Sequence, residues 1–283
     1  QSGMPDVNSA EPLDGTEILV WATQGENGPM RTFYLAAEGG LRILRQFDGA
    51  TIVTSHGELT WKTQEKELKL NGCAQADGSP RTPSKGVIMS ATLVKSNGQV
   101  AQKVVEADDG GFGPNPDIDE LGHFVTLTGS IGPYLFIREG SYSNSCGVHG
   151  NAAAASMVWD ANAGKPIDFL PELADAKKLV DTAQKKLDEI DQEQGGPENT
   201  DEPAFARFIP VYSEHGALRI DVQFVRWACY ACSDGQWSSY TRSAIVPTNW
   251  FPERMKTWAI PPVVVKDFAK AHPDWQIGGW SKR

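Results

Sequence analysis

Short runs rich in hydrophobic residues alternate with polar turn residues over most of this chain. In the first half, Gly, Asn, Asp or Ser residues separate the runs at roughly 8- to 12-residue intervals. Short strand-like runs with turns at this spacing are typical of β-rich folds. The sequence therefore predicts strands over 16–23, 31–38, 40–47, 50–55, 58–63, 66–73, 86–98 and 99–107.

The second half continues with strands and then changes period. Two strands are predicted within 123–147, a further one leads to a turn at 162–165, and later strands are predicted within 204–216, 217–230 and 238–248. From Pro171 to Gln194 the apolar residues recur at three- and four-residue steps, which predicts one long amphipathic helix over about 171–194. Pro171 suits a first helical turn, Gly195 ends the helix, and a short helix is predicted within 261–275. The predicted class is α+β, with antiparallel sheets.

Changes in composition divide the chain into three parts. Residues 1–14 are polar and are predicted to form a loose leader. Residues 15–120 are predicted to form a β-rich N-terminal domain, and residues 121–283 an α+β domain that contains both helices.

The composition is that of a globular protein, with 40% hydrophobic and 22% charged residues. The formal net charge is −10 at pH 7. Nucleic acids and anionic membrane surfaces would repel such a chain, so neither is expected as its main partner. A solvated acidic surface and a basic partner are the two explanations of the charge.

Much of the negative charge lies in one segment. Residues 171–202 hold ten acidic and four basic side chains, a net charge of −6. This segment is either a solvated helix face or a docking face for a basic protein.

No run of the sequence reaches the roughly 18 apolar residues of a membrane-spanning helix, so no transmembrane segment is expected. The first residues, Gln1-Ser2-Gly3-Met4, look like the remnant of a cleaved tag. On that interpretation a native export signal could have been cut away, so its absence here is uninformative, and the native precursor could carry a lipid anchor.

The cysteines are open to three interpretations. An even number in loop-like surroundings favours two disulfides, whose pairing the sequence leaves open. A zinc site would need a second close cysteine pair, and a redox motif would need a strand followed by a helix; neither is found here. Disulfides are therefore predicted for Cys73, Cys146, Cys229 and Cys232, and they imply an exported protein in the periplasm, at the cell surface or secreted.

Three short motifs follow one another in the second half. They are "CGVHGN" with Gly147, His149 and Gly150, then "WDANAGKPIDF" with Trp159, Asp160, Gly164 and Lys165, and then Phe169, Leu170 and Leu173 at the helix start. In this order they resemble the C-terminal domain of RsiV-type proteins, over roughly residues 121–270. That domain of unknown function also occurs in a peptidoglycan deacetylase and in many exported or lipid-anchored bacterial proteins. The end of the family pattern is replaced here by the C-x-x-C stretch and by "QWSSYTR".

The resemblance implies a cell-envelope protein without known catalysis. Its best understood relative is an extracellular receptor for lysozyme, a strongly basic enzyme. The expected function is therefore a non-enzymatic binding module for a basic, lysozyme-like protein or for a cell-wall fragment. The expected ligand-binding residues are His149, Trp159, Asp160, Trp237 and Tyr240. A structural role is the alternative for the first two, since His149 could hold a turn and Trp159 could pack in the core.

An enzyme acting on cell-wall glycan, a hydrolase or deacetylase, is the alternative function. The sequence has no Gly-x-Ser-x-Gly nucleophile motif, and its histidines are isolated rather than paired as in metal hydrolases. No catalytic residue, metal or cofactor is therefore predicted. The sequence does not fix the oligomeric state.

Overall fold

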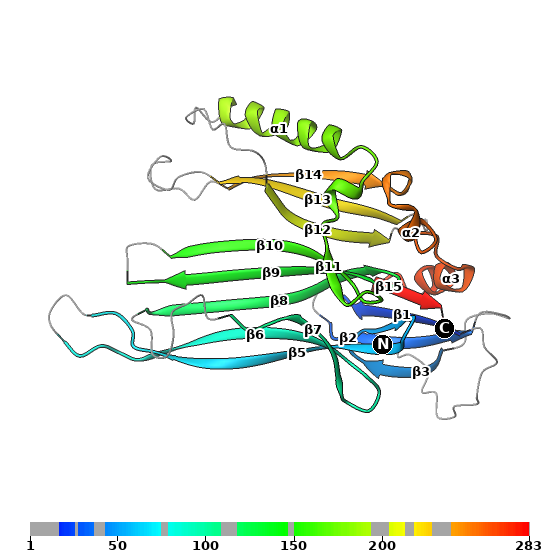
Figure 1. Ribbon diagram of the computed structural model, residues 1–283, viewed down its shortest axis with the longest axis horizontal. Coiled ribbons are helices and arrows are strands. Elements are labelled where there is room, and N and C mark those ends of the chain that lie inside the picture. The colour runs from blue at the N-terminus through cyan, green and yellow to red at the C-terminus, as the bar shows by residue number, and fades with distance from the viewer. Residues whose placement is uncertain are drawn as a thin grey trace.

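The computed structural model describes residues 17–25, 28–36, 43–74, 79–108, 118–146, 150–193, 204–212, 218–227 and 239–282. These residues form three sheets. In Figure 1 the three-stranded sheet lies above the large sheet with helix α1 on the outside, and the four-stranded sheet lies at the right-hand end of the large sheet. Strands far outnumber helices in this part of the chain, because short apolar and β-branched runs separated by turn residues make up most of it.

The first sheet brings the two ends of the described chain together. Its strand order is β15-β1-β2-β3, and every neighbouring pair is antiparallel. One face packs against helix α3 through Val264, Val265 and Phe268, and the other face turns toward the second sheet. The elements are β1 (Glu17–Gln24), β2 (Met30–Ala36), β3 (Ile43–Asp48), β15 (Trp275–Lys282) and α3 (Val263–Ala271).

The second sheet is the largest, with eight strands. Its order is β11-β10-β9-β8-β6-β5-β4, and β7 pairs with β6. All neighbours are antiparallel except β6 and β8, which run parallel where Val87 lies opposite Gly122. The strands are β4 (Thr51–Thr54), β5 (Gly57–Leu70), β6 (Ser84–Val94), β7 (Val100–Val105), β8 (Glu120–Ile131), β9 (Tyr134–Asn144), β10 (Asn151–Asp160) and β11 (Lys165–Ile167).

The third sheet carries the long helix. Its strands β12 (Ala204–Tyr212), β13 (Leu218–Trp227) and β14 (Ser239–Pro247) are antiparallel neighbours in that order. Helix α1 (Ala176–Glu193) contributes Leu179, Ala183 and Leu187 to a core shared with this sheet, because these residues recur on one side of the helix. The short helix α2 (Glu253–Lys256) adds the fully buried Met255 to the same core.

The predicted fold class is wrong in three respects. The described chain is mainly β rather than α+β, and the large sheet is mixed rather than purely antiparallel. The predicted helix over 171–194 is also too long, since α1 has 18 residues and begins at Ala176. Leu170–Glu172 form a separate 3-10 turn, after which Leu173 is extended (ψ 137°). Leu173 is nevertheless buried in the same core, so its apolar character continued the helical pattern without a helix.

The large sheet crosses the predicted domain boundary at residue 120. Strands β4 to β7 precede the boundary and β8 to β11 follow it, and β1 and β15 also pair across it. Separate folding of 15–120 and 121–283 stays a prediction, and residues 1–14 lie outside the described chain.

A disulfide between Cys73 and Cys146 ties two distant parts of the large sheet together. The Cα atoms of the two residues are 5.2 Å apart. Cys73 follows β5 and Cys146 follows β9, so the bridge joins the β5–β6 connection to the β9–β10 connection. Backbone hydrogen bonds lie beside it, from Gly72 N to the Ile118 carbonyl (3.1 Å) and from Asp119 N to the Asn144 carbonyl (2.9 Å).

Candidate functional site

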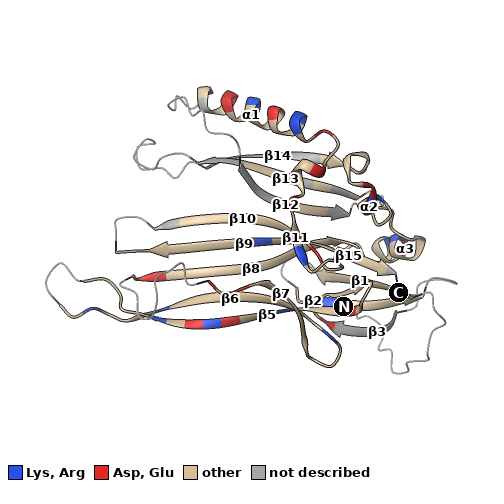
Figure 2. Ribbon diagram, viewed as in Figure 1, with Lys and Arg blue, Asp and Glu red and all other residues tan. Residues whose placement is uncertain are grey.

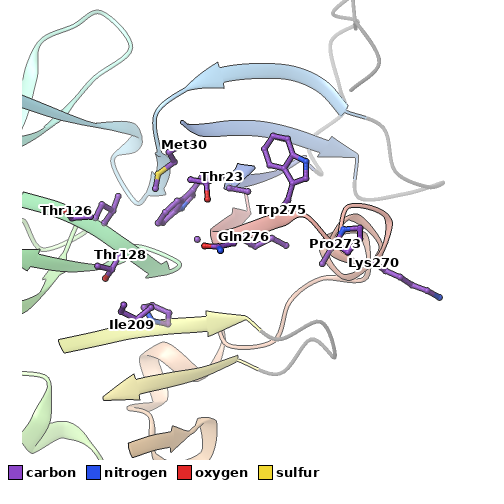
Figure 3. Close-up of a pocket in the computed structure, with 16 residues that line it drawn as sticks. Thr23, Met30, Thr126, Thr128, Ile209, Lys270, Pro273, Trp275 and Gln276 are labelled. Carbon is purple, nitrogen blue, oxygen red and sulfur yellow. The ribbon is translucent and has the colours of Figure 1, made fainter. Parts of the chain in front are cut away.

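A cleft of about 820 Å³ opens where the three sheets meet, and we call it the junction cleft. Figure 3 shows β1, β2 and β15 on one side of it, β8 on another and β12 on a third. Clefts of this size at the meeting of separate layers commonly hold ligands. It is lined by Trp21, Ala22, Thr23, Met30, Thr126, Leu127, Thr128, Ile209, Pro210, Ala269, Lys270, Pro273, Trp275, Gln276, Ile277 and Gly278.

The indole of Trp21 fixes how closely the first two sheets approach each other. Trp21 is 1% exposed, and its Nε1 donates a hydrogen bond to Ser130 Oγ of β8 at 3.2 Å. Its ring lies against Gly278 and Gly279 of β15, where a Cβ on either glycine would overlap the indole. Two adjacent glycines are therefore required for this contact.

Uncharged polar groups and apolar groups line the cleft together. Thr126 and Gln276 are exposed, and their side chains make no hydrogen bond with another described residue. Thr128 Oγ1, by contrast, already donates to the Phe136 carbonyl at 3.0 Å. Met30 and Ile209 provide apolar surface beside these groups (Figure 3). The cleft thus offers hydroxyl and amide groups next to apolar walls.

Two lining residues direct their side chains elsewhere. The ring of Trp275 packs edge-on against Phe33, with centroids 5.2 Å apart, and contacts Phe268 of α3 on the opposite face of the first sheet. Lys270 extends away from the cleft in Figure 3. Lys270 is also the one titratable residue among the described residues that line the cleft. This part of the lining therefore contains no acid–base pair of the kind that general acid–base catalysis needs.

A second pocket, of about 720 Å³, lies on the large sheet beside β7, β8 and β9. It contains His123, whose Nε2 is 3.3 Å from Glu139 Oε2 and whose Nδ1 is 3.1 Å from the Met89 carbonyl. Ser141 lies opposite His123 in the β8–β9 register. A hydrolytic serine needs a ring nitrogen directed at its hydroxyl. Because both ring nitrogens of His123 face other acceptors, this arrangement does not form a nucleophile–base pair.

Trp159 and Asp160 make structural contacts rather than line either pocket. Trp159 is 7% exposed, belongs to the core of the large sheet, and donates from Nε1 to Gln102 Oε1 at 2.8 Å. Asp160 Oδ1 accepts hydrogen bonds from the backbone N–H groups of Asn162 (2.9 Å) and Ala163 (3.1 Å), which shapes the predicted 162–165 turn. Ligand binding by these two residues stays a prediction that their contacts do not support.

The other expected ligand-binding and disulfide residues cannot be compared with the structure. His149, Trp237, Cys229 and Cys232 lie outside the described residues. Tyr240 lies in β14 opposite Arg226, and its side chain lies outside the description.

The charge of Asp160 also acts on a cluster of polar side chains around the buried Tyr134 at the start of β9. Burial is the main cause that raises the pKa of the Tyr134 hydroxyl, and the Asp160 carboxylate raises it further. The Arg254 guanidinium lies 5.7 Å from the centre of the Tyr134 ring and forms an ion pair with Glu172. The hydrogen bond to Glu172 raises the pKa of Arg254. These contacts hold α2 against the 3-10 turn and β9.

Replacing Trp159 by phenylalanine tests the structural interpretation. The change removes the Nε1–H donor to Gln102 but keeps most of the apolar area, so we expect a loss of about 1 kcal/mol in the free energy of unfolding. Urea denaturation measures the loss. Ligand affinity is expected to stay at the wild-type value, and a selective loss of affinity with unchanged stability would instead assign Trp159 to a binding site.

The charges on α1 are mixed rather than uniformly acidic. The helix contains four lysines and five acidic residues, and Figure 2 shows blue and red segments alternating along it. Lys177 Nζ pairs with Asp181 Oδ2 at 3.0 Å, one turn away. Glu198, Asp201 and Glu202, which contribute to the expected acidic segment, lie outside the described residues. The described part of the segment is therefore a poor match for a strongly basic partner.

The described residues contain no group of three or more His, Cys, Asp or Glu side chains that could hold a metal ion. None of the helices in these ranges combines the length and the apolar character that a membrane span requires.

By fold, the described chain is a mainly β protein with a cleft between its three sheets. No protein-family model matches the sequence, and no curated protein matches it. Two solved structures of the DUF3298 family, a domain of unknown function, are similar to it. One, from Pseudomonas aeruginosa PAO1, is 12% identical with a TM-score of 0.37, covering 72% of this chain and 95% of that one. The other, from Bacteroides fragilis NCTC 9343, is 12% identical with a TM-score of 0.39, covering 74% and 97%.

Similarity at this level carries no inference about function or fold. The relation to RsiV-type proteins stays a prediction from the sequence motifs. The cleft residues Thr126 and Gln276 were not singled out from the sequence, because isolated threonines and glutamines in strands are common. The glycine pair in "WQIGGW" was the one local signal of a close backbone approach.

Proposed function

We propose that this chain is a non-enzymatic binding module of the bacterial cell envelope, and that the junction cleft holds a peptidoglycan-related saccharide. The observation that carries the proposal is the chemistry of the lining. Uncharged hydrogen-bonding groups on Thr126 and Gln276 stand beside the apolar surface of Met30 and Ile209, and no acid–base pair accompanies them. Acetamido sugars present hydroxyl, amide and methyl groups, which complement such a lining.

An exported location is part of the proposal. The disulfide between Cys73 and Cys146 supports it, because disulfides persist in oxidising compartments outside the bacterial cytoplasm. The sequence motifs shared with exported and lipid-anchored proteins point the same way, and a lipid anchor in the native precursor belongs to the same hypothesis.

A basic protein is the less favoured ligand. The mixed charge of α1 offers little electrostatic selectivity for a lysozyme-like partner. A hydrolase or deacetylase is less favoured still, because neither described pocket presents a nucleophile with a free base.

Calorimetric titration tests the proposal with three ligands at two salt concentrations: the disaccharide N-acetylglucosaminyl-N-acetylmuramic acid, its peptide-bearing form, and hen lysozyme. We expect saturable binding of the saccharides, because their hydroxyl and acetamido groups meet the uncharged lining, whereas binding of the strongly basic lysozyme would weaken as salt is raised. The double variant Thr126→Val with Gln276→Leu should weaken that binding about tenfold or more, since each lost hydrogen bond contributes about 1 kcal/mol.

The matched control is Thr63→Val with Gln64→Leu, an exposed pair in β5 far from the cleft lining. This control should bind like the wild type. Equal loss in both double variants, or binding of lysozyme alone, would contradict the proposal.

A further inference from the structure

The wall of the junction cleft continues outward along one face of the large sheet. Thr126 lines the cleft, and Phe124 lies two residues before it in β8, so both are on the same face, about 7 Å apart along the strand. Residues directly opposite each other on neighbouring strands also share a face. In β9, Arg138 lies opposite Thr126. Tyr142 lies opposite Gly122, which is two residues before Phe124. We call Phe124, Arg138 and Tyr142 the outer platform.

Two aromatic rings provide most of the apolar surface of the outer platform. Phe124 is 51% exposed and Tyr142 is 37% exposed, and they are the aromatic members of the exposed large hydrophobic residues in the described ranges. The Phe124 ring extends over Gly122, and the Tyr142 ring extends over Gly150, because a Cβ on either glycine would overlap the ring. Each ring therefore leans over the sheet backbone and leaves one broad side uncovered.

A hydrogen bond holds the second ring in this position. The Tyr142 hydroxyl hydrogen-bonds the Glu120 carboxylate, which is the largest cause that raises the pKa of Tyr142. The negative face of an aromatic ring attracts partly positive hydrogen atoms, such as the C–H groups on one side of a sugar ring. Two oriented rings beside a saccharide cleft are thus suited to stacking on further sugar units.

Arg138 adds an unpaired positive charge next to the cleft. It is exposed and is the one basic residue of β9, and its guanidinium makes no ion pair or hydrogen bond with another described residue. Its register neighbours, Thr126 and Ser156, carry no charge. Glu139 follows in sequence but lies on the opposite face, where its carboxylate contacts His123. The Arg138 guanidinium is therefore free to bind a carboxylate through two parallel hydrogen bonds.

We propose that the outer platform extends the junction cleft and binds the following units of a longer saccharide chain that carries carboxylate groups. This inference rests on the saccharide site proposed for the cleft. Phe124 and Tyr142 stack on sugar rings, and Arg138 binds a carboxylate such as the lactyl group of N-acetylmuramic acid. The site then prefers an oligosaccharide to a disaccharide, and an acidic oligosaccharide to a neutral one.

A second copy of this chain fits the outer platform less well. Symmetric pairing of two platforms brings Arg138 of one copy toward the same residue of the other, and like charges repel. Each copy also has a net charge of −10. An acidic saccharide instead brings its carboxylate to the free guanidinium, and it reaches the platform directly from the cleft through Thr126.

Calorimetric titration of the wild type with three saccharides tests the extension. They are the disaccharide N-acetylglucosaminyl-N-acetylmuramic acid, the tetrasaccharide of two such units, and neutral chitotetraose, which has four N-acetylglucosamine units. We expect the tetrasaccharide to bind about tenfold more tightly than the disaccharide, because its added units stack on the aromatic rings. It should also bind about tenfold more tightly than chitotetraose, which has no carboxylate for Arg138.

Two variants separate the contributions of stacking and charge. Phe124→Ala should remove most of the tetrasaccharide's advantage over the disaccharide while disaccharide binding, which reports an intact fold, stays at the wild-type value. Arg138→Gln should abolish the preference for the tetrasaccharide over chitotetraose. The matched controls are Val100→Ala in β7 and Lys62→Gln in β5, both exposed and outside the platform, and they should bind like the wild type.

The outcomes distinguish failure of the extension from failure of the cleft. Disaccharide binding without any gain for the tetrasaccharide, or equal effects of platform and control variants, would overturn the extension and leave the proposed function standing. No binding of the disaccharide to the wild type would overturn the proposed function and this inference with it. Sedimentation velocity provides a further arm, since a dimer that Phe124→Ala abolishes would assign the platform to a second copy and overturn the saccharide.

Discussion

Replacing both Cys73 and Cys146 by serine is expected to lower the free energy of unfolding by about 4 kcal/mol. The two cysteines are 73 residues apart, so their bridge closes a long loop in the unfolded chain. In the chain-entropy treatment, a loop of that length gives a stabilisation near the upper end of what single disulfides provide. The bridge also holds the β5–β6 connection beside the β9–β10 connection, and the backbone hydrogen bonds from Gly72 to Ile118 and from Asp119 to Asn144 lie next to it.

Urea denaturation of the wild type and the double variant measures this effect. The denaturant slope should rise in the variant, because its unfolded state exposes more surface without the cross-link. The single variants Cys73→Ser and Cys146→Ser should each approach the stability of the double variant, since either change removes the same bond. A loss below about 1 kcal/mol would show that the bridge does not constrain the unfolded chain in this way.

Trp21→Ala is expected to cost about 3 to 5 kcal/mol of folding free energy. The Trp21 indole belongs to the core of the large sheet, although Trp21 itself lies in β1 of the first sheet. Truncation removes its packing on Gly278 and Gly279, and it leaves the Ser130 hydroxyl without that donor. We therefore expect the variant to have a large cavity in the core and weaker packing between the first two sheets.

Thermal and urea unfolding of Trp21→Ala should be compared with Trp250→Ala, a partly buried tryptophan that packs against another core. The control should lose less stability. Gly279→Ala provides an independent check, because its Cβ would overlap both Ser130 and the indole. Wild-type stability in Gly279→Ala would contradict the close contact between β15, β8 and Trp21.

Local patterns predicted where the strands lie but not how they pair. The runs at 16–23 and 50–55 correspond to β1 and β4, because both are short runs rich in apolar and β-branched residues with glycine on either side. The runs at 58–63 and 66–73 were expected as two strands and form the single β5, since 62–67 continues as exposed strand without a turn. The β1–β15 pair and the parallel β6–β8 pair join distant segments. Period-two patterns contain no information about such partners.

The junction cleft could not be predicted from the sequence either, because it forms between segments that are distant in the sequence. Its lining comes from β1, β2, β8, β12, α3 and β15, so no local motif could indicate it. Trp159 and Asp160 stood out in the sequence because they belong to a strand and a tight turn. In the structure their hydrogen bonds stabilise that strand and that turn. The two residues that stood out in the local sequence therefore make structural contacts. Thr126 and Gln276 could be recognised as cleft residues only once the arrangement of the sheets was known.

The most direct test of the proposed saccharide site is an NMR titration with ¹³C-methyl-labelled methionine. Met30 lines the junction cleft, Met157 lines the second pocket, and Met255 is fully buried in the core near α1. Addition of N-acetylglucosaminyl-N-acetylmuramic acid should shift the Met30 methyl resonance in a saturable manner while the Met157 and Met255 resonances stay in place. A shift of Met157 without Met30, or no shift of any methionine at millimolar ligand, would contradict the assignment of the junction cleft as the binding site.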